Sequence, residues 1–232
     1  MQRYINVRRV DRLRQVSKIL TFGGIGLMVV ALLISLRAAA NTGIALGLSV
    51  VGLASSQIGT VMIRRWPERG RSDQLLDAAL KGLDQRHALY HYLLGCSHAL
   101  FTPRGAMALF AVAEPGLFEL RDGVLWRTKV KRGVPTGNSS AMRSLFSQAT
   151  QEASELKRTL GRRLEAQTTW DVLPVIVFVH PEARLHADGA SPPSVHLKKL
   201  KDFVRNVPRR ATLTEKEATT LSAAYETFLL PG

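Results

Sequence analysis

Two long apolar runs without a charged residue constrain this chain more than any other feature of its sequence. Residues 19–36 give 18 such positions and residues 43–63 give 21. At 1.5 Å of rise per residue, helices of these lengths measure about 27 and 31 Å, close to the roughly 30 Å hydrocarbon core of a bilayer. The runs therefore predict two transmembrane helices, joined by a connection, residues 37–42, that carries one charge.

The basic residues gather on the outer flanks of these two runs. Residues 1–18 hold six Lys and Arg against one acid, and residues 64–71 hold four against one, whereas residues 72–232 hold 21 against 16. The positive-inside rule then places both termini in the cytoplasm. We expect the following residues to lie at the membrane interface and to contact anionic lipid: Arg8, Arg9, Arg12, Arg14, Lys18, Arg64, Arg65 and Trp66.

Two other interpretations of the apolar runs remain open. A basic start, an apolar run and the small residues 38–40 also fit a signal peptide with its cleavage site. The two runs could instead form a buried helical hairpin of a soluble protein, because Gly and Ser lower the hydrophobicity of the second run. In the membrane interpretation, the pairs Gly43/Gly47 and Ser55/Gly59 are spaced to let helix backbones approach closely.

The sequence divides into a membrane anchor over residues 1–71 and an α/β domain over residues 72–232. The expected helices are 73–85, 141–166, 195–206 and 214–229, and the expected strands are 88–94, 98–101, 106–112, 117–121, 124–127 and 172–179. The last strand is wholly apolar, which is typical of a strand buried in a mixed or parallel sheet with helices on both sides. Residues 129–140 are rich in Gly, Pro and Ser and predict a loop.

The order of these elements resembles the nuclease-related domain, NERD. The stretches that carry the resemblance are 72–86, 98–105 with the strand after it, 116–126, 175–181 and 196–201. The resemblance implies a restriction-endonuclease-like PD-(D/E)XK fold with a mixed central sheet. The whole layout is also similar to membrane-anchored NERD-like proteins of bacteria, which implies a multi-pass protein of the bacterial cytoplasmic (inner) membrane.

The chemistry of that family needs acidic ligands for a divalent metal, with a lysine beside them. The resemblance aligns the helix acid with Asp73, the aspartate that opens the second strand with Ser97, and the Glu-x-Lys pair of the third strand with Phe110 and Val112. Phe110 and Val112 can neither ligate a metal nor donate to a phosphate. We therefore expect no catalytic residue, metal site or cofactor, and a non-catalytic binding or scaffold module.

Two other functions remain open. A divergent nuclease acting on DNA or RNA would use Asp73, Glu114 and Asp122 with Mg²⁺, if a shifted register made Glu114 the strand carboxylate. Otherwise Glu114 is an exposed turn residue. In the third hypothesis, the chain is an accessory subunit of a larger membrane complex, held through the small residues of its hairpin.

The remaining polar residues give weaker signals. The basic residues that could contact nucleic acid, anionic lipid or another protein are Lys198, Lys199, Lys201, Arg205, Lys129, Lys131 and Arg132. His87 and His91 are four residues apart in a strand pattern, too far apart to share a metal. We expect His98, His180 and His196 to hydrogen-bond at strand ends, and Cys96 to be a small core residue.

Overall fold

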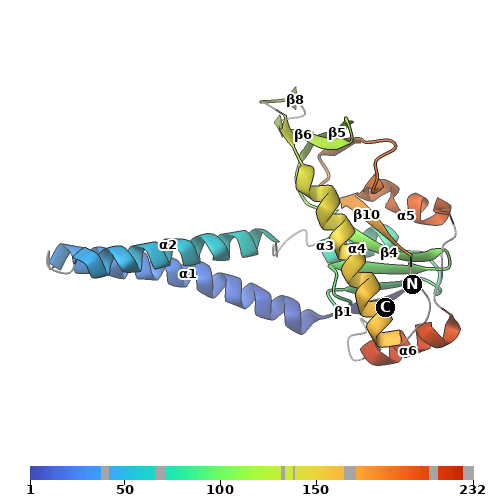
Figure 1. Cartoon of the computed structure of the whole chain (residues 1–232), viewed down its shortest axis with the longest axis horizontal. Helices are drawn as coiled ribbons and strands as arrows, with labels where there is room; N and C mark the ends of the chain where they lie inside the picture. Colours follow the sequence, from blue (N-terminus) through green and yellow to red (C-terminus); the bar gives the residue numbers. More distant parts are fainter. Residues whose placement is uncertain are drawn as a thin grey trace. The chain divides into compact units, whose positions relative to one another are not determined.

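The computed structural model describes residues 1–37, 42–65, 72–131, 134–137, 139–164, 171–208 and 214–226 (Figure 1). The chain folds into two compact units, each with its own internal packing. One unit is Val7–Arg71. The other combines Met1–Asn6 with Ser72–Gly232.

The first unit is a pair of long helices, α1 (Val7–Arg37) and α2 (Thr42–Arg65). Each contains a stretch long and apolar enough to cross a membrane, Gln15–Leu36 in α1 and Gly43–Val61 in α2. Core helices of soluble proteins and signal sequences share that length and composition, but core helices are mostly buried. Here the apolar side chains are exposed, as at Phe22, where 68% of the residue's surface is accessible.

Small residues bring the two helices together. A Cβ atom added at Gly24 would lie 2.5 Å from the carbonyl oxygen of Gly52, and one added at Gly59 would lie 2.4 Å from the Oγ1 of Thr21. The hydroxyl of Ser55 donates to the carbonyl oxygen of Leu20 across the same interface, at 3.0 Å. The expected close approach therefore occurs at Ser55 and Gly59.

Gly43 and Gly47 do not take part in this interface. A Cβ atom added at either position would have no atom within 4 Å. Their spacing on α2 places both on one side of the helix, because residues four apart are neighbours on a helix surface. The first of the two predicted small-residue pairs therefore faces away from α1.

A mixed sheet forms the centre of the second unit, with the strand order β1-β2-β3-β4-β10-β12. Its strands are β1 (Gln2–Ile5), β2 (Ala88–His91), β3 (His98–Thr102), β4 (Gly105–Val112), β10 (Val172–Phe178) and β12 (Ser194–His196). β2, β3 and β4 are antiparallel neighbours, and β10 runs parallel to both β4 and β12. A strand between two parallel neighbours is buried on both faces, which explains the apolar sequence of β10.

Helices pack on both faces of this sheet. The helices are α3 (Ser72–Leu80), α4 (Arg143–Leu164), α5 (Leu197–Asn206) and α6 (Glu215–Tyr225). Leu76 of α3 and Leu200 of α5 belong to the core cluster on one face, whereas Leu156 of α4 and Leu221 of α6 belong to the cluster on the other. Figure 1 shows α4 crossing its face diagonally. The expected arrangement of a sheet between two helical layers is present.

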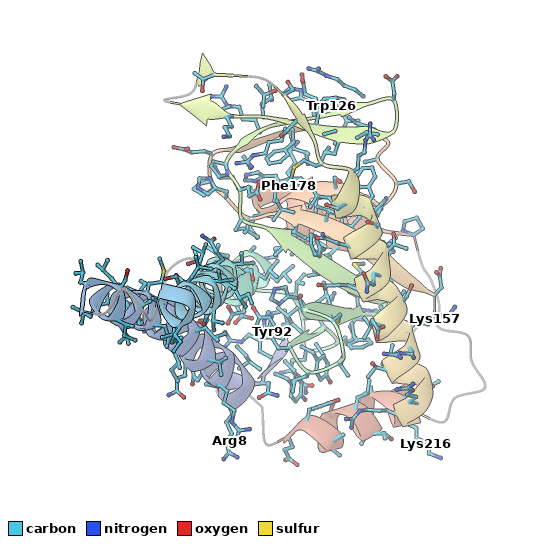
Figure 2. All side chains as sticks on the ribbon, turned by 60° about the vertical axis from the view of Figure 1, so that its left-hand side comes forward. Arg8, Tyr92, Trp126, Lys157, Phe178 and Lys216 are labelled. Atoms are coloured by element: carbon cyan, nitrogen blue, oxygen red, sulfur yellow. The ribbon has the colours of Figure 1, made fainter. Side chains whose placement is uncertain are left out.

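A second sheet, with the order β11-β5-β6-β9, packs beside the first. Its strands are β11 (Ala183–His186), β5 (Gly116–Arg121), β6 (Val124–Thr128) and β9 (Ser140–Ala141), and a separate pair is formed by β7 (Val130–Lys131) and β8 (Val134–Pro135). Asp122 and Gly123 both have positive φ, 50° and 72°, which the tight turn between β5 and β6 requires. Phe118 and Phe178 join the two sheets, with ring centroids 4.4 Å apart; Phe178 is labelled in Figure 2.

The N-terminal residues differ from the expected domain division. Residues 1–6 lie in the globular unit and not in the hairpin unit, because β1 pairs in parallel with β2, Gln2 opposite Ala88 and Ile5 opposite His91. Tyr4 is 3% exposed and belongs to the core. The hairpin is thus an insertion between the first strand and the first helix of the globular unit.

Other elements also differ from their expected bounds. α1 begins 12 residues before the apolar run, α3 ends at Leu80, and β2 ends at His91 because the next residue, Tyr92, has a φ of 61°. The expected loop over 129–140 contains short strands, and β11 and β12 were not anticipated. The helix expected from residue 214 begins as predicted, with Thr214 and Glu217 forming a capping box.

Candidate functional site

The strand positions that the resemblance aligns with the nuclease residues are packed as core. Val112 is 5% exposed, and Phe110 packs against the same cluster, which includes Phe178 and Leu145. Ala111, the residue between them, packs against the opposite cluster beneath α3, to which Leu109 also belongs. Because successive strand residues point to opposite faces, Phe110 and Val112 face away from the helix that carries Asp73.

Ser97, at the aligned position before β3, is held by a carboxylate from α4. The Glu152 carboxylate accepts a hydrogen bond from the Ser97 amide at 3.0 Å and another from its hydroxyl at 2.6 Å. Both donors of Ser97 are therefore engaged by one side chain. This contact ties α4 to the start of β3, a structural role that does not need a metal.

The acidic residues of the nuclease alternative lie in separate environments. Asp73 is 2% exposed in α3, whereas Glu114 is exposed and forms an ion pair with Arg127 of β6. Arg127 also donates to the carbonyl oxygen of Pro115, at 3.1 Å. Asp122 occupies the β5–β6 turn. Among the described residues, no group of three or more His, Cys, Asp or Glu side chains is placed to hold a metal ion.

The main cluster of buried polar groups lies between α3 and strands β2 and β3. His91 and His98 are 0% and 1% exposed, and their Nδ1 atoms are 2.7 Å apart. The Nε2 of His98 lies 3.0 Å from the hydroxyl oxygen of Ser72, and the Nε2 of His91 lies 3.3 Å from the Oδ1 of Asp77. Four side chains thus form one continuous chain: Ser72, His98, His91 and Asp77.

The chemistry of the end groups fixes where the protons lie when both imidazoles are neutral. The Asp77 carboxylate accepts, so the Nε2 of His91 carries a proton and its Nδ1 accepts. His98 then donates through Nδ1 and accepts from the Ser72 hydroxyl through Nε2. Burial, and secondly the neighbouring His91, lower the pKa of His98 well below its usual value, because a charged ring is poorly solvated there.

His180 and His196 form hydrogen bonds, as expected. The Nδ1 of His196 accepts from the amide of Lys198 at 3.2 Å and caps α5, and the Nδ1 of His180 accepts from the amide of Glu182 at 3.1 Å. Burial lowers the pKa of His196. Cys96 is buried in the core, and burial raises the pKa of its thiol.

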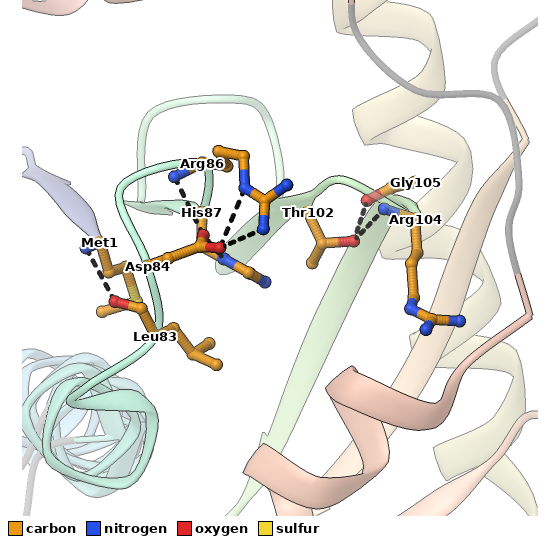
Figure 3. Close-up of polar contacts among 8 residues, drawn as sticks. All are labelled: Met1, Leu83, Asp84, Arg86, His87, Thr102, Arg104 and Gly105. Carbon is orange, nitrogen blue, oxygen red and sulfur yellow. Dashed lines mark hydrogen bonds and ion pairs between the residues drawn. The ribbon is translucent and has the colours of Figure 1, made fainter.

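A second polar group surrounds the turn before β2 (Figure 3). The Asp84 carboxylate accepts from the guanidinium of Arg86 at 2.6 Å and lies 2.6 Å from the Nδ1 of His87. These contacts lower the pKa of Asp84 to about 2, with Arg86 as the largest cause. The amino group of Met1 donates to the carbonyl oxygen of Leu83 at 3.1 Å, which joins the N-terminal residues to the same turn.

The basic residues singled out from the sequence do not form one continuous site among the described residues. Lys198, Lys199 and Arg205 are exposed on α5, opposite its buried Leu200 and Val204. The Nζ of Lys201 donates to the carbonyl oxygen of Lys81 at 2.7 Å, so it connects α5 to the end of α3. Lys129 is exposed beyond β6, in the other sheet; the Lys131 side chain and Arg132 lie outside the described part of the chain.

The cations predicted at the membrane interface lie at the outer ends of the hairpin helices. Arg8, Arg12 and Lys18 are exposed along the first turns of α1. Arg9 and Arg14 lie in α1, and Arg64 and Arg65 in the last turn of α2, but their side chains are not among those described, and Trp66 lies outside the described residues.

The comparisons with known proteins give no relative for this chain: no family model, no curated protein and no solved structure matches it.

Proposed function

We propose that this chain is a membrane-anchored, NERD-like module of a bacterial inner membrane. Its globular unit lies at the cytoplasmic face and acts by binding a partner, not by metal-dependent cleavage of nucleic acid. The packing of Phe110 and Val112 in the core carries this proposal. A nuclease of this type needs a carboxylate and a lysine at these two positions to hold the metal and stabilise the leaving oxygen.

The order of elements in the globular unit supports the resemblance on which the proposal rests. α3 is followed by the antiparallel strands β2, β3 and β4, then by the β5–β6 hairpin and the short strands β7 to β9, then by α4, and then by β10 parallel to β4. The layout that the resemblance implies is a helix, a strand hairpin, an apolar third strand, a Gly-rich hairpin and a later apolar strand, and α3, β2–β3, β4, β5–β6 and β10 follow that order. Since fold alone does not establish function, the proposal of a non-catalytic role rests on the uncharged strand positions.

The pairing of β1 with β2 supports the membrane orientation. One strand precedes the hairpin and the other follows it, so a single sheet contains both flanks of the two helices. If α1 and α2 span a membrane, both flanks must lie on the same side of it. The basic flanks favour the cytoplasmic side.

The same pairing argues against a cleaved signal peptide. The expected cleavage site, residues 38–40, lies outside the described residues. Cleavage there would still separate β1 from the rest of the globular unit and remove Tyr4 from its core. A buried hairpin of a soluble protein is disfavoured by exposed apolar side chains such as Ile19 and Leu36, which are 69% and 76% exposed.

The orientation is tested by labelling cysteines in intact spheroplasts. In a Cys96→Ala background, we expect Asn41→Cys to react with a membrane-impermeant maleimide added outside, because residue 41 lies between the two helices. The matched control Ser147→Cys, on the exposed side of α4 in the globular unit, should react only after permeabilisation. Labelling of position 147 without permeabilisation would contradict the proposed orientation.

The absence of nuclease activity is tested on the full chain, because residues 72–232 alone would lack β1. Purified protein is mixed with labelled single- and double-stranded DNA and RNA at low salt, with Mg²⁺ or Mn²⁺ and in parallel with a chelator. We expect no metal-dependent cleavage. Cleavage that disappears in Glu114→Gln would overturn the proposal in favour of an unconventional nuclease, and retardation without cleavage would identify nucleic acid as the bound partner.

A further inference from the structure

The proposed function does not explain the buried series of hydrogen-bonded side chains that runs from Ser72 through His98 and His91 to Asp77. Burying a polar group costs free energy unless the group is hydrogen-bonded. In this series of four side chains, both ring nitrogens of both histidines have a hydrogen-bond partner. Only the two side chains at the ends of this series are accessible to solvent. The imidazoles of His98 and His91 are inaccessible, whereas Ser72 is partly exposed and the Asp77 side chain is 15% exposed.

The first link of this series of contacts joins a hydroxyl group to an imidazole. The Ser72 hydroxyl lies 3.0 Å from the Nε2 of His98, within the range over which an imidazole accepts a serine proton. His98 is in turn oriented through its other nitrogen by His91. A hydroxyl, a neutral imidazole base and a group that orients the base are the parts from which serine nucleophiles are built.

His98 alone would be a poor base, because a buried imidazolium is costly. The second histidine removes this difficulty. When the Ser72 proton moves to the Nε2 of His98, the Nδ1 proton of His98 can move to the Nδ1 of His91. The positive charge then lies on His91, beside the Asp77 carboxylate, and His98 stays neutral. Every donor still has an acceptor in this second arrangement, so the transfer breaks no hydrogen bond.

We propose that Ser72 is a nucleophilic serine with acyl-transfer activity on carboxylic esters, and that the chain through His98 and His91 to Asp77 accepts its proton. The oxygen of Ser72 forms a bond to the ester carbonyl carbon while its proton enters the chain. The bond from that carbon to the alcohol oxygen then breaks, and the departing oxygen takes a proton from the Nε2 of His98. Water, activated by the same chain, releases the acid and restores Ser72.

The position of Ser72 in the fold fits this role. Ser72 is the first residue of α3, where the first helical turn leaves amide N–H groups without acceptors inside the helix. The partial positive charge at a helix N-terminus favours the negative charge that develops on oxygen during acyl transfer. Asp73, a buried carboxyl, is the next residue of the same helix, and the ring of Tyr92 lies beside the histidines, with its centroid 5.1 Å from that of His98.

The test uses the full chain, purified in detergent, and a biotin-linked fluorophosphonate. This probe forms a bond from serine oxygen to phosphorus and releases fluoride, with the serine proton passing to the base. We expect labelling at Ser72, located by peptide mapping, at a rate that falls in acid, where the base is protonated. Release of p-nitrophenol from p-nitrophenyl acetate gives the corresponding acyl-transfer readout.

Substitutions distinguish a chemical role of these four side chains from a purely structural one. Ser72→Ala should abolish the label, and His98→Gln should slow labelling by about 100-fold or more, because glutamine keeps a hydrogen bond but accepts no proton. Asp77→Asn, at a partly exposed position, should slow labelling and change its dependence on pH. Ser97→Ala, next to His98 but bonded to Glu152 instead, is the matched control and should leave the rate unchanged.

Two results would overturn the inference. One is labelling of Ser72 no faster than that of an ordinary exposed serine such as Ser154 of α4. The other is an unchanged rate and pH profile in Asp77→Asn, a variant that remains informative if His98→Gln fails to fold. Neither result bears on the proposed function, which rests on Phe110, Val112 and the hairpin.

Discussion

Tyr4 of β1 and Tyr90 of β2 stack face to face, with ring centroids 4.5 Å apart and ring planes only 4° from parallel. The two residues are also direct partners in the register of the strands. Tyr90 meets Phe101 and Tyr225 edge-on, at 5.4 and 5.9 Å. The strand that precedes the hairpin therefore contributes to an aromatic cluster in the core of the globular unit.

Replacing Tyr4 by alanine should destabilise the globular unit. Truncation of a buried aromatic residue removes its transfer free energy and leaves a cavity, which together cost about 3–5 kcal/mol. We expect a lower midpoint of thermal unfolding for Tyr4→Ala, measured on the full chain in detergent. Tyr4→Phe keeps the stacking and loses the hydroxyl's contacts, among them the one with Gln2, so it should remain closer to wild type. Equal stability of Tyr4→Ala and wild type would show that β1 is not docked.

Acid should destabilise the globular unit through His98. Its pKa is lowered in the folded protein, so the unfolded state binds a proton more readily, and stability is lost as pH falls below about 6.5. The slope approaches about 1.4 kcal/mol per pH unit for this one group. Denaturant unfolding between pH 7.5 and 5 measures it. His98→Asn should show a shallower loss, and parallel curves for the two proteins would contradict this origin.

The contact between Ser97 and Glu152 should contribute measurably to stability. It consists of two hydrogen bonds to a carboxylate, and hydrogen bonds to charged groups contribute about 1.5–3 kcal/mol each. A double-mutant cycle with Ser97→Ala and Glu152→Gln isolates the side-chain part, and we expect a coupling energy of about 1–2 kcal/mol. Additive effects of the two substitutions would show that the hydroxyl and the carboxylate do not interact in solution.

The hairpin should depend on Gly24 but not on Gly47. A larger side chain at Gly24 would collide with the backbone of α2 at Gly52, whereas Gly47 faces open space. We therefore expect Gly24→Leu to separate the helices and Gly47→Leu to leave them paired.

Disulfide formation between Leu20→Cys and Ser55→Cys, in a Cys96→Ala background, reports the pairing, because Ser55 bonds to the Leu20 carbonyl oxygen. Crosslinking that survives Gly24→Leu would contradict the packing. Loss of a copurifying protein in Gly47→Leu, with the crosslink intact, would instead support the accessory-subunit hypothesis.

Local sequence patterns made many of the helices, strands and turns predictable. The uncharged runs located both long helices, the apolar run at 172–179 located β10, and Asp122-Gly123 located its turn. Phe110 and Val112 were recognised as uncharged from their side-chain types alone. Such features depend on local sequence, so a single chain reveals them.

Features that depend on distant pairing were not predictable. The segment 2–5 has only four residues, and its basic neighbourhood resembles a membrane flank, so its pairing with β2 leaves no local signal. The His91–His98 contact depends on the register between β2 and β3, which places the two residues opposite each other. The contacts with Ser72 and Asp77 also require α3 to pack against these strands. His91 shares a strand face with the apolar Leu89, which could have suggested a buried polar group but not its partners.

The insertion of the hairpin also sets an order for biosynthesis. Gln2 leaves the ribosome long before its partner Ala88, and both apolar helices are made in the interval. The first strand therefore stays unpaired until β2 has been synthesised, and the sheet closes only after both helices have been made. Folding of the globular unit thus has to bring together two strands that are separated along the sequence by the whole helical pair.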